Sequence, residues 1–167
     1  KEYSLQIPYA GYNMVISMSD QSIRDFLLQM HNIYLQESLP AEKFAKKRIL
    51  PKKQNKAIRK ASEDRYERVG KEAEARTKEI VRLVSSLGRI TSEIQSAYNN
   101  LSSLKSIERG RFDIDLFSLS KGERADLREV LDLANDCHSI KMLKNTPNKV
   151  LIRLHRLFAP KFGFSYR

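Results

Sequence analysis

The amino-acid sequence predicts a mainly α-helical protein with one small β-hairpin near its C-terminus. Apolar residues recur at helical spacing through most of positions 10–105. Alternation of apolar and polar residues, which is typical of strands, begins only after Gly110. The 167 residues, 41% of them hydrophobic, suffice for one ordinary domain or two small ones with a buried core. We therefore expect helices first and a small sheet last.

The N-terminal part of the sequence predicts two helices. A short one is expected at about positions 10–18 and a longer amphipathic one at about 20–37, with Ser19 or Asp20 as its N-cap. The apolar residues of the longer helix recur every three or four positions: Ile23, Phe26, Leu27, Met30, Ile33 and Tyr34. Pro40 and Pro51 interrupt the helical pattern, so we expect a helical segment at 1–40 and a basic linker at 41–53.

A heptad pattern follows the linker and predicts long helices. Its apolar positions are Tyr66, Ala73, Ile80, Leu87, Ile94 and Leu101, interleaved with Val69, Arg76, Leu83, Ile90, Ala97 and Leu104. Arg76 alone is not apolar. Gly88 costs about 1 kcal/mol relative to alanine inside a helix and often marks a helix end. We therefore expect two helices at 54–87 and 89–105, with an unbroken coiled coil as the alternative.

The last third of the sequence predicts a strand, a helix and a hairpin. "RFDIDLFSL" alternates like a strand, and "SKGERADLREVLDLANDC" gives a helix at 122–135 that begins with the capping-box pair Ser120 and Glu123. Two apolar runs then flank the turn-rich "KNTPN". A winged-helix domain has this order of elements. We therefore expect a long helix plus a winged-helix domain at 54–167.

The net charge of +11 lies in two segments of the chain. Residues 41–60 hold nine lysines and arginines beside the single acid Glu42, and residues 138–167 hold seven and no acid. Clustered cations bind a phosphate backbone because they release its counterions. Double-stranded DNA is therefore the expected partner. A solvated linker explains the first segment equally well.

The candidate DNA contacts come from both basic segments. The hairpin supplies Lys141, Lys144, Lys149 and Arg153, and the first segment supplies Lys52, Lys53 and Lys56. The helix at 122–135 is net acidic, which is unfavourable for groove binding. The alternative function is a protein-interaction or oligomerisation module built on the long helices, which would regulate or tether an effector or other subunits.

Three stretches resemble a known family. "AGYNMVISMSDQSIRDFLLQMHNIY" is similar to the end of the core and the lid of bacterial origin-recognition-like AAA+ P-loop ATPases. "PKKQNKAIRKASEDRY" is similar to the helix that leaves the lid, and "RLHRLFAPKFGFSYR" to the closing strand and tail of the family's winged helix. Residues 70–140 match only in the order of elements.

The resemblance implies a lid at 1–40 whose Arg24 senses nucleotide. It also implies that ATP and Mg²⁺ are held by a core outside this sequence, since the chain has no G-x-x-x-x-G-K-[ST] loop and no strand ending in paired acids. We therefore expect no cofactor in this chain and no catalytic site of its own. Replication control or antiviral defence is what family membership suggests.

The remaining residues predict little chemistry. Cys137 and His138 are adjacent, but zinc needs about four ligands, so we expect no metal site. The aromatic residues of the C-terminal tail, Phe158, Phe162, Phe164 and Tyr166, are expected to anchor it to the domain, with base stacking as the alternative. There is no signal peptide and no run of about 18 apolar residues, so we expect a cytoplasmic protein without membrane contact.

Overall fold

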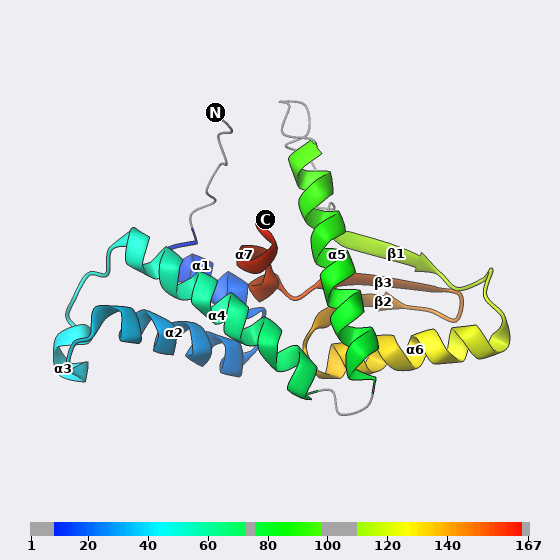
Figure 1. Ribbon diagram of the computed structural model, residues 1–167, viewed down its shortest axis with the longest axis horizontal. Coiled ribbons are helices and arrows are strands. Elements are labelled where there is room, and N and C mark those ends of the chain that lie inside the picture. Colours follow the sequence, from blue (N-terminus) through cyan, green and yellow to red (C-terminus); the bar gives the residue numbers. More distant parts are fainter. Residues whose placement is uncertain (1–8, 73–75, 98–109, 165–167) are drawn as a thin grey trace. The chain divides into compact units, whose positions relative to one another are not determined.

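The computed structural model describes residues 9–72, 76–97 and 110–164 (Figure 1). These residues contain seven α-helices and one three-stranded antiparallel sheet, so the prediction of a mainly helical fold with a small β-part is confirmed. They form two compact units. The N-terminal unit comprises the described residues up to Arg65 and those from Arg156 onward, and the sheet unit those from Tyr66 to His155.

The N-terminal unit is helical. It contains α1 (Tyr12–Ser19), α2 (Ile23–Glu37), α3 (Ala41–Phe44), the first part of α4 (Pro51–Glu72), a 3-10 turn (Arg156–Phe158) and α7 (Ala159–Phe162). Both predicted N-terminal helices are confirmed. Pro51 is the first residue of α4, where its missing N–H costs nothing, so α4 begins three residues before the expected start at position 54.

The predicted N-cap of α2 is wrong. Ser22 occupies this position, and its Oγ accepts a hydrogen bond of 3.2 Å from the Asp25 amide. Ser19 belongs to α1 instead, since its Oγ donates to the Val15 carbonyl within that helix. Asp20 has a φ of 51° and ends α1 in the left-handed conformation. Three residues, Asp20 to Ser22, therefore separate the helices where the sequence suggested a direct cap.

The C-terminal tail is anchored to the N-terminal unit. Phe158 is fully buried and Phe164 is 6% exposed. The Tyr9 hydroxyl donates to the Phe164 carbonyl at 2.8 Å, and the Lys161 amide donates to Ser62 Oγ at 3.0 Å. Anchoring is thus confirmed for Phe158 and Phe164, whereas Tyr166 lies outside the described residues.

The sheet unit contains the end of α4, α5 (Thr77–Ala97), β1 (Arg111–Asp115), α6 (Lys121–Asp136), β2 (Ile140–Asn145) and β3 (Lys149–Leu154). The predicted strand, helix and hairpin are all present. The strand order is β1-β3-β2, because β1 pairs with the second strand of the hairpin. Buried side chains of β3, Val150, Ile152 and Leu154, form the core together with residues of α5 and α6.

The predicted helix break at Gly88 is wrong, and so is the unbroken coiled coil. Helix α5 runs through Gly88 because Ile80, Val84, Leu87 and Thr91 are all buried along one of its faces. Burying such side chains contributes more than the cost of about 1 kcal/mol for a helical glycine. Helix α4 ends at Glu72 and α5 begins at Thr77, after Arg76 with a φ of 59°. Positions 98–105 of the expected helix lie outside the described residues.

Candidate nucleic-acid interface

The DNA contacts predicted in the hairpin lie on one face of the sheet. Directly paired residues of neighbouring strands project to the same face. Lys141 pairs with Arg153, Lys144 with Leu151, and Lys149 with Asp115. The opposite face carries the buried residues Val150, Ile152 and Leu154. All four basic residues that the sequence singled out in the hairpin therefore lie on the polar face of the sheet.

A row of three cations crosses this polar face. Arg111 of β1 is paired with Arg153 of β3, which is paired with Lys141 of β2. Directly opposed side chains have Cβ atoms about 5 Å apart, so the three cationic side chains begin close together on this face. Arg153 Nη1 donates to the Leu154 carbonyl at 3.2 Å, which orients its guanidinium. Two residues further along β1, Asp113 forms an ion pair of 3.9 Å with Lys149. Positive charge on this face is thus concentrated at the end where β1 begins, around Arg111.

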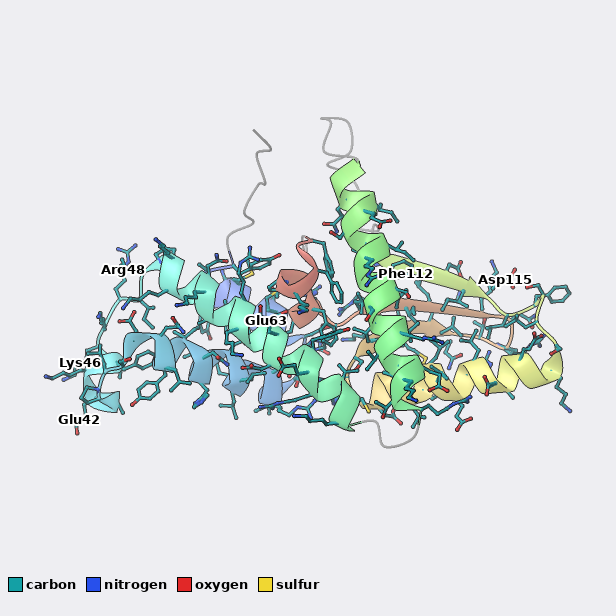
Figure 2. All side chains as sticks on the ribbon, in the orientation of Figure 1. Glu42, Lys46, Arg48, Glu63, Phe112 and Asp115 are labelled. Atoms are coloured by element: carbon teal, nitrogen blue, oxygen red, sulfur yellow. The ribbon has the colours of Figure 1, made fainter. Side chains whose placement is uncertain are left out.

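The β2–β3 turn and the loop from β1 to α6 lie at the same end of the sheet (Figure 1). They are joined by a hydrogen bond of 2.7 Å from the Leu116 amide to the Asn148 carbonyl. Figure 2 labels Asp115 at this end of β1, and its Oδ1 accepts a hydrogen bond of 2.9 Å from the Phe117 amide. We call this end, residues 115–120 with 144–149, the tip of the sheet unit. Lys144, Lys149 and Phe117 are exposed on it.

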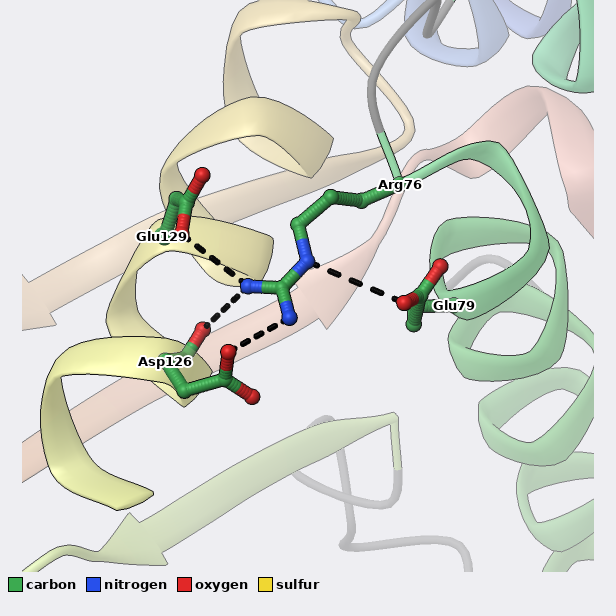
Figure 3. A network of polar contacts seen from close by, with 4 residues as sticks. All are labelled: Arg76, Glu79, Asp126 and Glu129. Carbon is green, nitrogen blue, oxygen red and sulfur yellow. Dashed lines mark hydrogen bonds and ion pairs between the residues drawn. The ribbon is translucent and has the colours of Figure 1, made fainter. Parts of the chain in front are cut away.

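The acids of α6 are partly neutralised within the sheet unit. Arg76 Nη1 donates to Glu129 Oε2 at 3.0 Å, and Nη2 pairs with Asp126 Oδ1 (Figure 3). Arg76 Nε lies 3.7 Å from Glu79 Oε1 at the start of α5. The hydrogen bond with Asp126 raises the pKa of the guanidinium further, so it stays charged. The residue that was out of place in the heptad pattern thus ties the start of α5 to α6.

Both arginines of α6 donate hydrogen bonds to residues of the tip. Arg128 Nη1 donates to Asn145 Oδ1 at 2.9 Å, and Nη2 donates to the Thr146 carbonyl. Arg124 Nη2 donates to the carbonyls of Phe117 and Leu119, at 3.5 and 3.4 Å. These cations fix the tip rather than project from α6. The structure therefore gives α6 no excess of outward cations for groove binding.

The basic segment at 41–60 belongs to the N-terminal unit. Lys52 and Lys56 are exposed in the first turns of α4, and Lys46 and Arg48 point outward before it (Figure 2). Lys53 differs, because its Nζ lies 3.2 Å from Glu37 Oε2, which also pairs with Lys47 at 2.8 Å. The Glu37 side chain is 1% exposed, and its hydrogen bond with Lys47 lowers the pKa of the carboxyl. Part of this basic charge is therefore balanced locally.

Arg24 lies in the first turn of α2 and is exposed. Its neighbours Ile23 and Leu27 are exposed too, at 77% and 58%, which is unusual for large apolar side chains one turn apart. Arg24, the predicted nucleotide-sensing residue, is thus flanked by two apolar side chains that the described residues leave largely exposed.

Cys137 and His138, the adjacent pair noted in the sequence, follow α6. Cys137 is half-buried, and His138 is exposed with a φ of 51° just after α6. Across the described ranges, no cluster of three His, Cys, Asp or Glu side chains could hold a metal ion. The helices seen in those ranges are too short or too polar to cross a membrane.

The structure defines a class: a mainly helical protein with two compact units, the second of which has a basic sheet face. The chain belongs to the ORC-CDC6-like family, which matches residues 2–167 and is related to AAA+ ATPases. The resemblance found in the sequence is therefore confirmed at the level of the family. Neither the curated proteins nor the solved structures gave a significant match.

The sequence reading missed Arg111 as a member of the basic face. Its signal was the alternation of "RFDID", which puts Arg111 on the polar face together with Asp113 and Asp115. The pairing with Arg153 could not be read in advance, because register across non-consecutive strands depends on tertiary packing. The balancing of Lys53 by Glu37 was missed for the same reason, since the two lie sixteen positions apart.

Proposed function

We propose that this chain is the lid and winged-helix part of an AAA+ ATPase and that the sheet unit binds double-stranded DNA. One observation carries the proposal: Arg111, Lys141 and Arg153 stand in a direct cross-strand row, and Lys144 and Lys149 share their face. Such a row presents several cations on one face of the sheet, and each phosphate that they contact releases counterions from the DNA. Sheet order and the preceding helix α6 also match the winged-helix arrangement.

The mode of binding follows from α6. Its arginines hold the tip, and Asp126 and Glu129 are paired with Arg76, so Lys121 at its start is the one exposed cation that α6 presents among the described residues. We therefore propose that the sheet face and hairpin contact the phosphate backbone with little sequence preference. Affinity should then fall steeply with salt.

The test compares DNA binding by wild type and two triple variants that lose the same charge. One variant carries Arg111→Gln, Lys141→Gln and Arg153→Gln, and its control carries Lys78→Gln, Arg82→Gln and Arg89→Gln on the exposed side of α5. Fluorescence anisotropy with a generic duplex across a salt series gives the slope of log K against log salt. The first variant should flatten this slope by about two to three and the control hardly at all.

Equal losses in the two variants would mean that net charge alone attracts DNA. No binding by wild type at low salt, with a native circular dichroism spectrum, would sink the DNA proposal. A native circular dichroism spectrum is required of the first variant as well, so that unfolding does not mimic a loss of binding.

The N-terminal unit is proposed to act as the lid, with Arg24 reaching the nucleotide phosphates. The apolar side chains of Ile23 and Leu27 beside Arg24 support this, since a lid needs a surface that packs on the ATPase core. In a protein where this chain follows such a core, Arg24→Ala should lower ATP turnover at least tenfold and Arg24→Lys less so. Unchanged turnover in Arg24→Ala would refute the sensing role.

A protein-interaction module is the second candidate. Leu87 is 7% exposed and Ile80 is fully buried in the sheet unit, so these heptad positions are occupied by the unit's own core. The observation that favours this candidate is the exposed apolar surface of α1 and α2, which also includes Tyr12 at 75% and Ile16 at 45%. Loss of self-association or partner binding in Ile23→Ser/Leu27→Ser, with DNA binding intact, would support it.

A further inference from the structure

Phe117 is a large apolar side chain displayed at the tip of the sheet unit. It is 74% exposed, and it lies in the loop between β1 and α6. A single exposed phenylalanine is ordinary on a protein surface and needs no explanation by itself. What sets Phe117 apart is how its backbone is held and which side chains surround it.

The backbone around Phe117 is fixed on both sides. Its N–H donates to Asp115 Oδ1 at 2.9 Å, and its carbonyl accepts a hydrogen bond of 3.5 Å from Arg124. The Leu116 amide donates to Asn148 in the hairpin turn at 2.7 Å, and Leu119 N–H donates to the Leu116 carbonyl at 3.3 Å. Because Leu116 is fully buried, the chain must turn outward at the next residue. The ring is thus presented by a rigid support.

The hairpin turn beside Phe117 is held in the same way. Arg128 donates to the Asn145 side chain and to the Thr146 carbonyl. Thr146 Oγ1 accepts a hydrogen bond of 3.1 Å from the Lys149 amide. Lys149 is paired in register with Asp115, two residues before Phe117. One helix therefore positions both the aromatic loop and the turn that carries the lysines, through Arg124 and Arg128.

Lysines of the hairpin and of α6 surround Phe117, and one of them, Lys149, is ion-paired with Asp113 at 3.9 Å. Lys144 and Lys149 of the hairpin and Lys121 at the start of α6 are exposed on the elements that adjoin the loop. Lysine is depleted in the centres of protein–protein interfaces, whereas aromatic rings beside cations recur where proteins hold nucleic acids: the cations neutralise phosphates and the ring packs on bases. The composition of the tip thus favours nucleic acid over an apolar protein partner.

We propose that Phe117 packs against a base of the bound DNA while Lys144 and Lys149 contact the flanking phosphates. This proposal rests on DNA binding by the sheet unit and adds a contact that phosphate attraction alone does not require. An apolar side chain that enters a base step or stacks on an unpaired base is insensitive to sequence. The tip then gains affinity for DNA over other polyanions without reading base edges.

The test uses the absence of tryptophan from the sequence. Phe117→Trp introduces a single indole at the proposed contact, and Ile90→Trp is the control, since Ile90 is 42% exposed on α5 in the same unit. Addition of a duplex, and of the same duplex with one unpaired base, should quench the indole fluorescence of Phe117→Trp strongly and that of Ile90→Trp weakly. Inorganic polyphosphate, which has charges but no bases, should bind without quenching the fluorescence of Phe117→Trp.

Affinity gives a second, independent readout. Phe117→Ala should weaken binding of the duplex about tenfold, within the range measured for loss of one base–aromatic contact, and leave the salt slope unchanged. Lys144→Ala/Lys149→Ala should instead lower the slope. Tight binding by wild type, together with unquenched fluorescence in Phe117→Trp and unaltered affinity in Phe117→Ala, would overturn the role of Phe117 alone. Wild type that fails to bind DNA would overturn both this role and the proposed function.

Discussion

Asp25 and Arg65 form an ion pair inside the N-terminal unit. Their side chains are each 1% exposed, with Arg65 Nε 3.4 Å from Asp25 Oδ1, and the guanidinium also lies 5.9 Å from the centre of the Phe158 ring. Charges are costly to bury, and each of these two compensates the other. The pair thereby links α2, α4 and the C-terminal tail in one cluster.

Removing one partner of this pair should destabilise the protein strongly. Asp25→Ala removes the carboxylate beside the buried Arg65 guanidinium, and we expect it to lower the free energy of unfolding by about 3 to 5 kcal/mol. Urea denaturation followed by circular dichroism measures the change. Glu63→Ala, an exposed position on α4, is the control and should change stability by less than about 0.5 kcal/mol. If Asp25→Ala also falls within that range, the Asp25 carboxylate does not stabilise the buried Arg65.

Glu37 should make the stability of the protein depend on pH. Hydrogen bonding to Lys47, and further interaction with Lys53, lowers the pKa of its carboxyl in the folded state below the ordinary value of 4.5. The stabilisation is therefore fully present above pH 4.5 and is lost as the pH falls through the lowered folded pKa. At pH 7, Glu37→Gln should have a lower melting temperature than wild type. This difference in melting temperature should shrink as the pH falls below 4.5. A difference that stays constant down to pH 3 would exclude this linkage.

At the scale of whole elements, α5 and α6 show why periodicity predicts a helix better than it predicts where the helix ends. The heptad pattern ran across the gap between α4 and α5, and its one irregular residue, Arg76, lay at that gap. Arginine at a φ of 59° is held there by Glu79, three residues further on in α5, and by carboxylates of α6, which are distant in the sequence. Gly88 was the stronger local signal for a break, but burial of the surrounding face outweighed it.

Two glycines at helix ends should respond in opposite ways to alanine. A Cβ on Gly122, in the first turn of α6, would meet no atom within 4 Å, so Gly122→Ala should stabilise the protein by about 0.5 to 1 kcal/mol. Gly163 ends α7 with a φ of 76°, which is unfavourable for alanine. Gly163→Ala should therefore destabilise the protein by about 1 to 2 kcal/mol, although a Cβ there would meet no atom within 4 Å. Denaturant midpoints compare the two. Stabilisation by both substitutions would contradict the left-handed conformation of Gly163.

At the scale of the molecule, the sequence located the charge but could not assign it to surfaces. Composition alone placed the excess in two segments, and alternation in the hairpin correctly put its basic residues on one face. The addition of Arg111 required the β1–β3 pairing, and the removal of Lys53 from the free charge required the fold of α2 against the start of α4. Long-range contacts decide both, and no local pattern encodes them.

This assignment predicts unequal contributions from the three candidate lysines of α4. If the basic segment of the N-terminal unit contributes to DNA binding, Lys52→Ala and Lys56→Ala should each reduce the salt slope by close to 0.9, the value for one phosphate contact on duplex DNA. Lys53→Ala should reduce it by clearly less, because Glu37, 3.2 Å away, already serves as the counterion of Lys53. Anisotropy titrations across a salt series measure all three. When Glu37→Gln is also present, Lys53→Ala should reduce the salt slope nearly as much as Lys52→Ala and Lys56→Ala do. Equal reductions by all three lysine variants, with and without Glu37→Gln, would show that the Glu37 pairing does not persist in the DNA-bound protein.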